Sequence, residues 1–256
     1  MMEAKRLPAK QGWEWIKQGY ALFMKAPLLW IVLLLICLVS AAGLSMIPTL
    51  GEPLVSLLTP AVIIGLMVGC RELQRGNELE LAYLFSGFQH HTAQLITLGG
   101  IALVGQYLIF GVMMLLGGAA LVTILMNGQP PESPEIIAQA LAGAGIAVLL
   151  GLVLFSILMM ALQFAPMLVY FNKLTPASAL QTSLSAFTRN IGAMFVYITT
   201  LVFLGILASI PLMLGWLILM PMIFTTLYAA YRDIFPPETE ATPAEENQFT
   251  REDGTF

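Results

Sequence analysis

The chain has 256 residues, of which 58% are hydrophobic and only 10% are charged. Because soluble domains carry about 25% charged residues, the missing polar surface indicates a protein surrounded by lipid. The net charge is −4, whereas nucleic-acid-binding proteins are typically basic. We therefore expect no nucleic-acid partner.

Six apolar stretches are long enough to cross a bilayer, which takes about 20 residues in a helix. In chain order they cover residues 27–47, 53–70, 93–126, 136–171, 191–209 and 211–230. About 26 residues precede the first, so we expect a retained helix rather than a cleaved signal peptide. The third and fourth stretches exceed one straight crossing. We expect them to tilt, to extend past the bilayer as a hairpin, or to break at Gly99-Gly100 or Gly117-Gly118.

The distribution of charge predicts the orientation in the membrane. With six crossings, all eleven Lys and Arg residues fall on one side, and only Glu52, Glu132 and Glu135 fall on the other. Basic residues mark the cytoplasmic side, so we predict a bacterial inner-membrane protein with both termini in the cytoplasm. An odd number of crossings would split the basic residues between the two sides.

A unit consisting of an amphipathic helix and two spans occurs three times, at about residues 8–75, 76–173 and 174–235. Similar short motifs begin the units at residues 20–23, 82–85 and 184–187. We predict three helices lying in the cytoplasmic interface, with apolar faces that include Trp13, Ile16 and Tyr20 in the first, Leu81, Leu84 and Phe85 in the second, and Leu180, Leu184 and Phe187 in the third. Thr175 and Pro176 are typical of a helix start.

The ends of the first and third units are also alike. Pro60 is followed after eleven residues by Arg71 and Glu72, and Pro221 after eleven residues by Arg232 and Asp233. The fold class predicted is therefore an all-α membrane protein with six spans, three interfacial helices and a pseudo-threefold repeat, in one domain covering residues 1–235. The alternative explanation for the apparent repeat is that apolar sequences align easily with one another, whether or not they are related.

Polar groups inside the spans are few. Ionisable side chains are nearly absent from the span centres, which argues against ion-coupled transport and against intramembrane metal or aspartyl enzymes. Gln106 and Gln163 are the largest polar side chains there, and we expect them to form interhelical hydrogen bonds, including with one another. Pro166 should free a backbone carbonyl one turn earlier. These three residues are the candidate intramembrane polar site.

The charged pairs at the ends of the spans, Arg71 with Glu72 and Arg232 with Asp233, are expected to anchor helix ends at the lipid headgroups. Catalysis on headgroups is the alternative role for these residues. No GxSxG, Walker or HExxH motif occurs, and the adjacent His90 and His91 point apart on a helix. We therefore expect no enzyme, no metal site and no cofactor.

The last segment, residues 236–256, contains six acidic residues and one arginine. Such a composition predicts a disordered cytoplasmic tail. We expect a solvated terminus or a docking segment for a protein partner.

The chain resembles poorly characterised six-span inner-membrane proteins of proteobacteria. The resemblance rests on five segments, residues 8–13, 19–27, 164–169, 177–190 and 231–235. More distantly the chain is similar to YciC-like envelope proteins and to the membrane domain attached to some glycerophosphodiester phosphodiesterases. The resemblance covers nearly the whole chain except the tail. It implies a fold and no catalytic residues, because the phosphodiesterase domain is absent.

The leading functional prediction is a non-enzymatic inner-membrane protein that interacts with lipid or with envelope machinery. The alternative is a transporter or channel for an uncharged or lipidic molecule. Membrane lipids are the expected partners, and a protein partner would bind through the bundle or the acidic tail. The oligomeric state is left open by the sequence.

Overall fold

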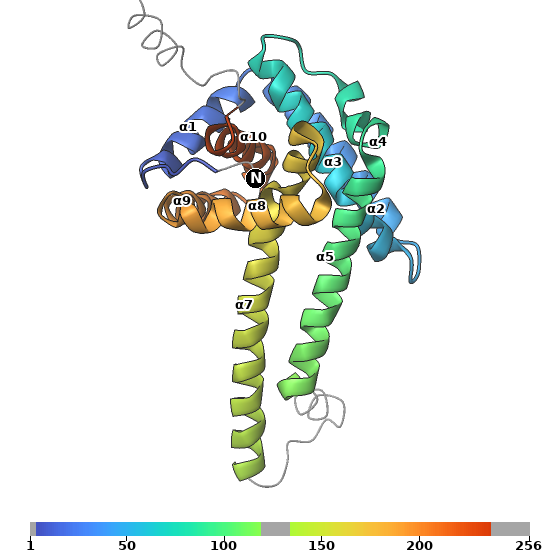
Figure 1. Ribbon diagram of the computed structural model, residues 1–256, viewed down its shortest axis with the longest axis vertical. Coiled ribbons are helices and arrows are strands. Elements are labelled where there is room, and N and C mark those ends of the chain that lie inside the picture. Colours follow the sequence, from blue (N-terminus) through green and yellow to red (C-terminus); the bar gives the residue numbers. More distant parts are fainter. Residues whose placement is uncertain (1–3, 119–133, 237–256) are drawn as a thin grey trace, which may run out of the picture.

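The computed structural model describes residues 4–118 and 134–236, which are all-helical without strands (Figure 1). The expected end of the third span after residue 118, the turn up to residue 133 and the acidic tail from residue 237 lie outside the described residues. The elements in order are α1 (Gln11–Phe23), α2 (Pro27–Ser45), α3 (Gly51–Gln74), the 3₁₀ helix η1 (Leu81–Phe85), α4 (Ser86–Gln89), α5 (Thr92–Met113), the π-helical turn η2 (Met114–Gly118), α7 (Pro134–Asn172), α8 (Pro176–Arg189), α9 (Ile191–Ser209) and α10 (Trp216–Ile234).

Five of the described helices are long and apolar enough to cross a membrane. They are α2, α3, the stretch 92–116, the stretch 145–172 and α9. The sixth expected span corresponds to α10, which begins at Trp216 rather than at residue 211. It starts late because residues 210–215 form a turn in which Leu212 and Met213 have positive φ. It has 19 residues, and its C-terminal turns carry Arg232 and Asp233, so it is not among these five.

The long third and fourth apolar stretches form a hairpin that projects beyond the rest of the molecule (Figure 1). α7 is one helix of 39 residues, or about 58 Å at 1.5 Å per residue. α5 changes to π-helical geometry over Met114–Gly118, and this segment includes the Gly117-Gly118 pair. The structure thus shows a local change of helix geometry at the second glycine pair, while tilting and extension past the bilayer stay predictions.

The short elements alternate with hairpins of long helices. α1 precedes the α2/α3 hairpin, η1 and α4 precede α5/α7, and α8 precedes α9/α10. Each short element packs against the second long helix of the hairpin before it: η1 and α4 against α3, α8 against α7, and α1 against α10. Because α1 is the first helix and α10 the last, this packing closes the chain into a ring.

Two of these contacts are made through glycines that allow close backbone approach. A Cβ added at Gly19 of α1 would lie 2.3 Å from Thr226 Cγ2 of α10, and one added at Gly87 of α4 would lie 2.1 Å from the carbonyl oxygen of Ala61 of α3. Small residues at helix contacts bring backbones together, which is the usual way that helices associate in a membrane.

The third contact uses a serine. Ser183 of α8 is fully buried, and its hydroxyl donates to the carbonyl of Met160 at 2.8 Å while accepting from the backbone N–H of Phe164 at 3.1 Å. Met160 and Phe164 are four residues apart in α7, so one hydroxyl contacts both members of an i→i−4 backbone pair. The start of α8 follows the sequence prediction, because Thr175 accepts from the Ser178 N–H and Pro176 occupies the first turn.

The small-residue faces of α1 and α8 differ from the faces expected from large apolar residues. Trp15 is fully buried, whereas Trp13 and Tyr20 are each 50% exposed. In α8 the buried residues are Ala179, Ser183, Ala186 and Phe187. The faces that pack against the neighbouring helices therefore include small residues such as Gly19 and Ser183 beside the buried Trp15 and Phe187, and the interfacial position of these helices stays a prediction.

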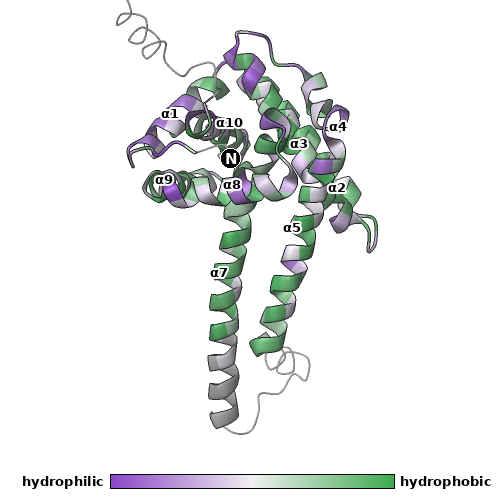
Figure 2. Cartoon of the chain, viewed as in Figure 1, coloured by the Kyte–Doolittle hydropathy of each residue, from purple (hydrophilic) through white to green (hydrophobic). Residues whose placement is uncertain are grey.

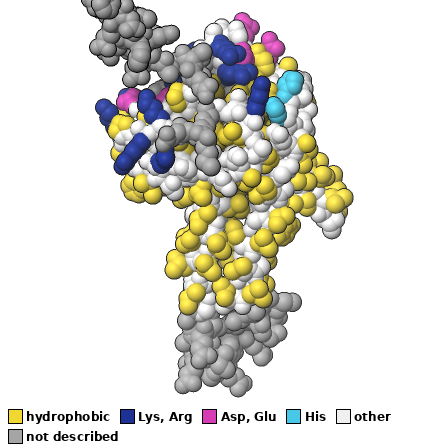
Figure 3. Space-filling view, viewed as in Figure 1, with side chains coloured by type: hydrophobic (Ala, Val, Ile, Leu, Met, Phe, Trp, Pro, Cys, Tyr) yellow, Lys and Arg dark blue, Asp and Glu magenta, His cyan; other side chains and the backbone are white. Residues whose placement is uncertain are grey.

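The hydrophobic core lies at one end of the long helices, where the short elements cover them. Buried core residues fall in the first part of α2, α5 and α9 and in the last part of α3, α7 and α10. The opposite halves expose large apolar side chains, and the described part of the α5/α7 hairpin is coloured as mostly hydrophobic in Figure 2. In the view of Figure 3 the Lys, Arg, Asp and Glu side chains gather at the core end. This polarity fits a molecule whose exposed apolar halves face lipid.

Candidate functional site

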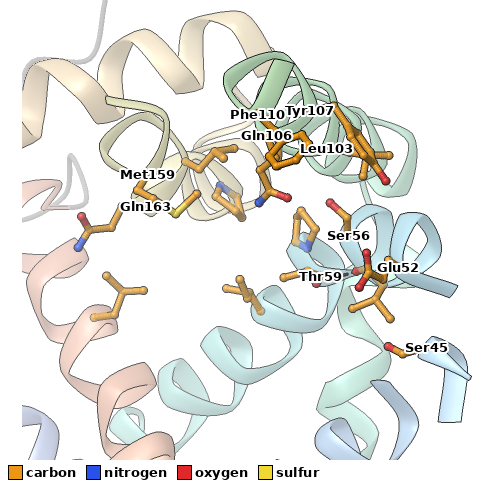
Figure 4. Close-up of a pocket in the computed structure, with 17 residues that line it drawn as sticks. Ser45, Glu52, Ser56, Thr59, Leu103, Gln106, Tyr107, Phe110, Met159 and Gln163 are labelled. Carbon is orange, nitrogen blue, oxygen red and sulfur yellow. Dashed lines mark hydrogen bonds between the residues drawn. The ribbon is translucent and has the colours of Figure 1, made fainter. Parts of the chain in front are cut away.

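A cavity of about 1040 Å³ lies between α3, α5 and α7, with contributions from the end of α2 and from α10 (Figure 4). Its apolar lining includes Ile63, Leu103 and Leu162. Its polar lining consists of Ser45, Glu52, Ser56, Thr59, Gln106, Tyr107 and Gln163. The cavity is open to the surroundings, because Gln106 and Tyr107 line it and are nevertheless exposed.

The structure brings the three candidate polar residues to this one cavity, since Gln106, Gln163 and Pro166 all line it. Figure 4 shows the Gln106 amide directed into the space between α3 and α7, and the Gln163 amide directed away from it, on the α10 side. No hydrogen bond joins these two described amides. The expected pairing of the two glutamines is therefore wrong, because their helices present them to different sides of the cavity.

α3 adds a polar stripe that the sequence analysis missed. Glu52, Ser56 and Thr59 are spaced by four and three residues, which places them on one face of the helix, and all three line the cavity. The missed signal was this spacing of polar residues along an otherwise apolar span. The sequence predicted for Glu52 only a position on the outer side of the membrane.

Two buried prolines interrupt the backbone hydrogen bonding of the helices beside the cavity. Pro60 and Pro166 lie inside α3 and α7, and a proline has no N–H to offer the carbonyl four residues earlier. Those carbonyls belong to Ser56 and Leu162, which both line the cavity. The site therefore combines amides, hydroxyls and a carboxylate with apolar side chains, beside two helix turns that each lack one backbone hydrogen bond.

The charged residues at the end of α3 form a network within the protein. Glu72 accepts hydrogen bonds from Asn77 at 2.7 Å, Arg75 at 3.1 Å and Arg71 at 3.3 Å. The Arg71 guanidinium also lies 4.9 Å from the ring centroid of Phe171 of α7, a cation–π geometry. This network orders the end of α3 and joins it to the end of α7.

The corresponding pair in α10 holds α1. Asp233 accepts from Gln11 at 2.7 Å and from Trp15 at 3.1 Å, while Arg232 donates to Gln18 at 2.9 Å. The carboxylates of both pairs are thus engaged by protein groups. Arg71 and Arg232 keep 35% and 37% of their side chains exposed, and headgroup anchoring stays a prediction for these two arginines.

The described residues contain no group of three His, Cys, Asp or Glu side chains placed to hold a metal ion. His91 packs edge-on against Tyr170 of α7 at a centroid distance of 6.3 Å. Cys37 and Cys70 are both free. The described lining of the cavity offers groups for hydrogen bonding, apolar side chains and the Glu52 carboxylate.

Comparison with known proteins gives one informative relative. No family model matches the chain, and no solved structure matches it. The chain is 29% identical over 264 residues to a protein of Burkholderia thailandensis described as a probable inner membrane protein, and the alignment covers 94% of this chain and 97% of the relative. Together with the five long apolar helices, this relative supports a multi-pass protein of the inner membrane.

Proposed function

We propose that the protein is a non-enzymatic inner-membrane protein that holds a membrane lipid in the cavity between α3, α5 and α7. The observation that carries the proposal is the length over which the cavity follows α3. Its lining on α3 extends from Glu52 to Ile63, which is about 16 Å at 1.5 Å per residue. The hydrocarbon core of a bilayer is about 30 Å thick, so the cavity matches one leaflet.

The chemistry of the lining also supports a lipid. Polar groups lie along the first turns of α3 at Glu52, Ser56 and Thr59, and apolar groups follow at Pro60 and Ile63. A lipid has the same order of a polar headgroup, ester groups and chains. Within the described lining, Glu52 is the sole carboxylate and has no histidine or cysteine beside it, an arrangement that offers no nucleophile with its base.

The proposal includes six crossings, with α10 as the sixth, and a threefold arrangement of units. The ring of contacts between each short element and the preceding hairpin supports it. The threefold arrangement is also supported by a buried proline in the second long helix of each hairpin, namely Pro60, Pro166 and Pro221. Six crossings place the basic residues on the cytoplasmic side and the mouth of the cavity near Glu52 in the outer leaflet.

A second candidate function is the transport of an uncharged or lipidic molecule. The lining helices α3 and α7 are each interrupted by a proline, and α5 ends in the π-helical turn Met114–Gly118. Such interruptions are places where helices bend. A transporter would move its ligand between leaflets, whereas a lipid-holding protein would retain it.

The test compares two neighbouring tryptophan substitutions. Leu103 lines the cavity, whereas Val104 is 57% exposed on another face of α5. Leu103→Trp should lower the amount of lipid retained by the purified protein in native mass spectrometry, and Val104→Trp should leave it unchanged. Equal retention in both variants and the wild type would contradict the proposal, as would a co-purifying protein in place of lipid.

Proteoliposomes separate the two functions. Labelled lipid should keep its distribution between leaflets when the wild-type protein is present. Movement between leaflets that Leu103→Trp abolishes and Val104→Trp preserves would establish the transport function instead.

A further inference from the structure

We propose that the cavity selects an outer-leaflet phospholipid whose headgroup carries an ammonium group, and that Glu52 pairs with this group. The inference rests on the proposed function and adds the class of headgroup. It starts from the charge of the lining, because Glu52 is the one formally charged side chain among the described residues that form it.

Basic residues are absent from this end of the molecule. The described lining contains no Lys or Arg, and with six crossings all eleven basic residues of the chain lie on the cytoplasmic side. An anionic headgroup at the mouth would meet the Glu52 carboxylate with no cation to balance it. An ammonium group would form an ion pair with the same carboxylate.

The hydroxyl groups of the lining already have partners within the protein. Ser45 donates to the carbonyl of Ala41 at 2.8 Å, and Thr59 donates to that of Val55 at 2.7 Å. Ser56 donates to the carbonyl of Gly99 at 3.4 Å. Their O–H donors are therefore engaged within the protein, while their oxygens can still accept a hydrogen bond from a donor such as an ammonium group.

Four polar side chains of the lining, Glu52, Gln106, Tyr107 and Gln163, make no hydrogen bond or ion pair with any described residue. The Gln163 amide is directed away from the cavity (Figure 4), which leaves Glu52, Gln106 and Tyr107 for a ligand. Glu52 and Tyr107 lie at the same end of the cavity in Figure 4, and the Tyr107 ring is 60% exposed there. The Glu52 carboxylate matches an ammonium group, while the Gln106 amide and the Tyr107 hydroxyl can donate to phosphate and ester oxygens.

A purely structural role for Glu52 makes a different prediction. Glu52 lies in the first turn of α3, where an acid interacts favourably with the helix dipole. That role affects stability and does not depend on the headgroup of the lipid. The preference between headgroups therefore separates the two roles.

The experiment uses the full chain with phosphatidylethanolamine and phosphatidylglycerol of identical acyl chains, supplied in equal amounts and measured by native mass spectrometry. The wild type should retain more phosphatidylethanolamine. Glu52→Gln keeps the shape of the side chain and should reduce this preference about fivefold, the size expected for an exposed ion pair of roughly 1 kcal/mol. Glu80→Gln, at an exposed acid outside the cavity, should leave the preference unchanged.

A second variant protects the test against loss of folding. Glu52→Lys should reverse the preference toward phosphatidylglycerol, a gain that an unfolded protein would not show. Equal retention of both lipids by the wild type, or an unchanged preference in both Glu52 variants, would overturn the headgroup assignment. The proposed function would survive that result if Leu103→Trp still lowered lipid retention, and would fall with it if Leu103→Trp had no effect.

Discussion

The indole nitrogen of Trp15 donates a hydrogen bond to Asp233 at 3.1 Å, although the two residues are 218 positions apart in the chain. Trp15 is fully buried, and its ring also packs edge-on against Tyr197 of α9 at 5.9 Å between centroids. This bond joins the first helix to the last and completes the ring of hairpins.

Asp233→Ala should destabilise the protein. The substitution leaves the buried Trp15 N–H without its acceptor, which costs about 1–3 kcal/mol. The free energy of unfolding in detergent micelles measures the effect. The control is Glu14→Ala on α1, because Glu14 forms an exposed pair with Lys17 at 2.8 Å and such pairs contribute at most about 1 kcal/mol. An equal loss in both variants would contradict the role assigned to Asp233.

Gly19→Ala should weaken the contact of α1 with α10. The added Cβ would lie 2.3 Å from Thr226 Cγ2 and 2.5 Å from Thr226 Cα, and overpacking of this kind costs about 1–3 kcal/mol. Gly43 of α2 is the matched control, because a Cβ there meets nothing within 4 Å. Gly43→Ala should be neutral or stabilising by about 0.5–1 kcal/mol. The same unfolding measurement compares them, and a tolerated alanine at Gly19 would rule out the close approach.

Ser183→Ala should separate α8 from α7. It removes the hydroxyl that contacts both Met160 and Phe164, at an expected cost of about 0.5–1.5 kcal/mol for the lost hydrogen bonding. Ser156→Ala removes an exposed hydroxyl that bonds only within α7, to Leu152, and should have little effect. Hydrogen exchange of the α8 backbone should increase in the first variant alone. Unchanged protection there would show that the hydroxyl is dispensable.

The sixth crossing can be tested with single cysteines in a chain whose Cys37 and Cys70 are replaced by alanine. Thr49→Cys, in the turn between α2 and α3, should react with a membrane-impermeant thiol reagent added outside the cell membrane. Pro236→Cys, just after α10, should react only after lysis, because six crossings return the chain to the cytoplasm. Labelling of Pro236→Cys from outside would show that α10 does not cross.

Several features of the fold followed from local sequence. Apolar runs of about 20 residues predict membrane helices wherever they occur in a chain, and five such helices are present. Thr175 and Pro176 predicted the start of α8 from neighbouring residues alone. The alternation of short elements with hairpins likewise reflects the order of apolar and amphipathic segments along the chain.

The candidate site could be predicted only in part. Gln106, Gln163 and Pro166 stood out as interruptions in apolar helices, and they line one cavity. The sequence did not indicate that α3 would contribute Glu52, Ser56 and Thr59 to the same space. That depends on the rotation of α3 about its axis, which is determined by its contacts with α5 and α7.

The sequence by itself determined that this chain enters a membrane and where its helices lie, because hydrophobicity and helix signals act over a few turns. Only the tertiary structure decided that Trp15 rather than Trp13 is buried, that Asp233 holds α1, and that the two glutamines do not pair. These outcomes depend on contacts between segments far apart in the chain. In such contacts small residues allow helices to approach, and each buried polar group must find its partner across the bundle.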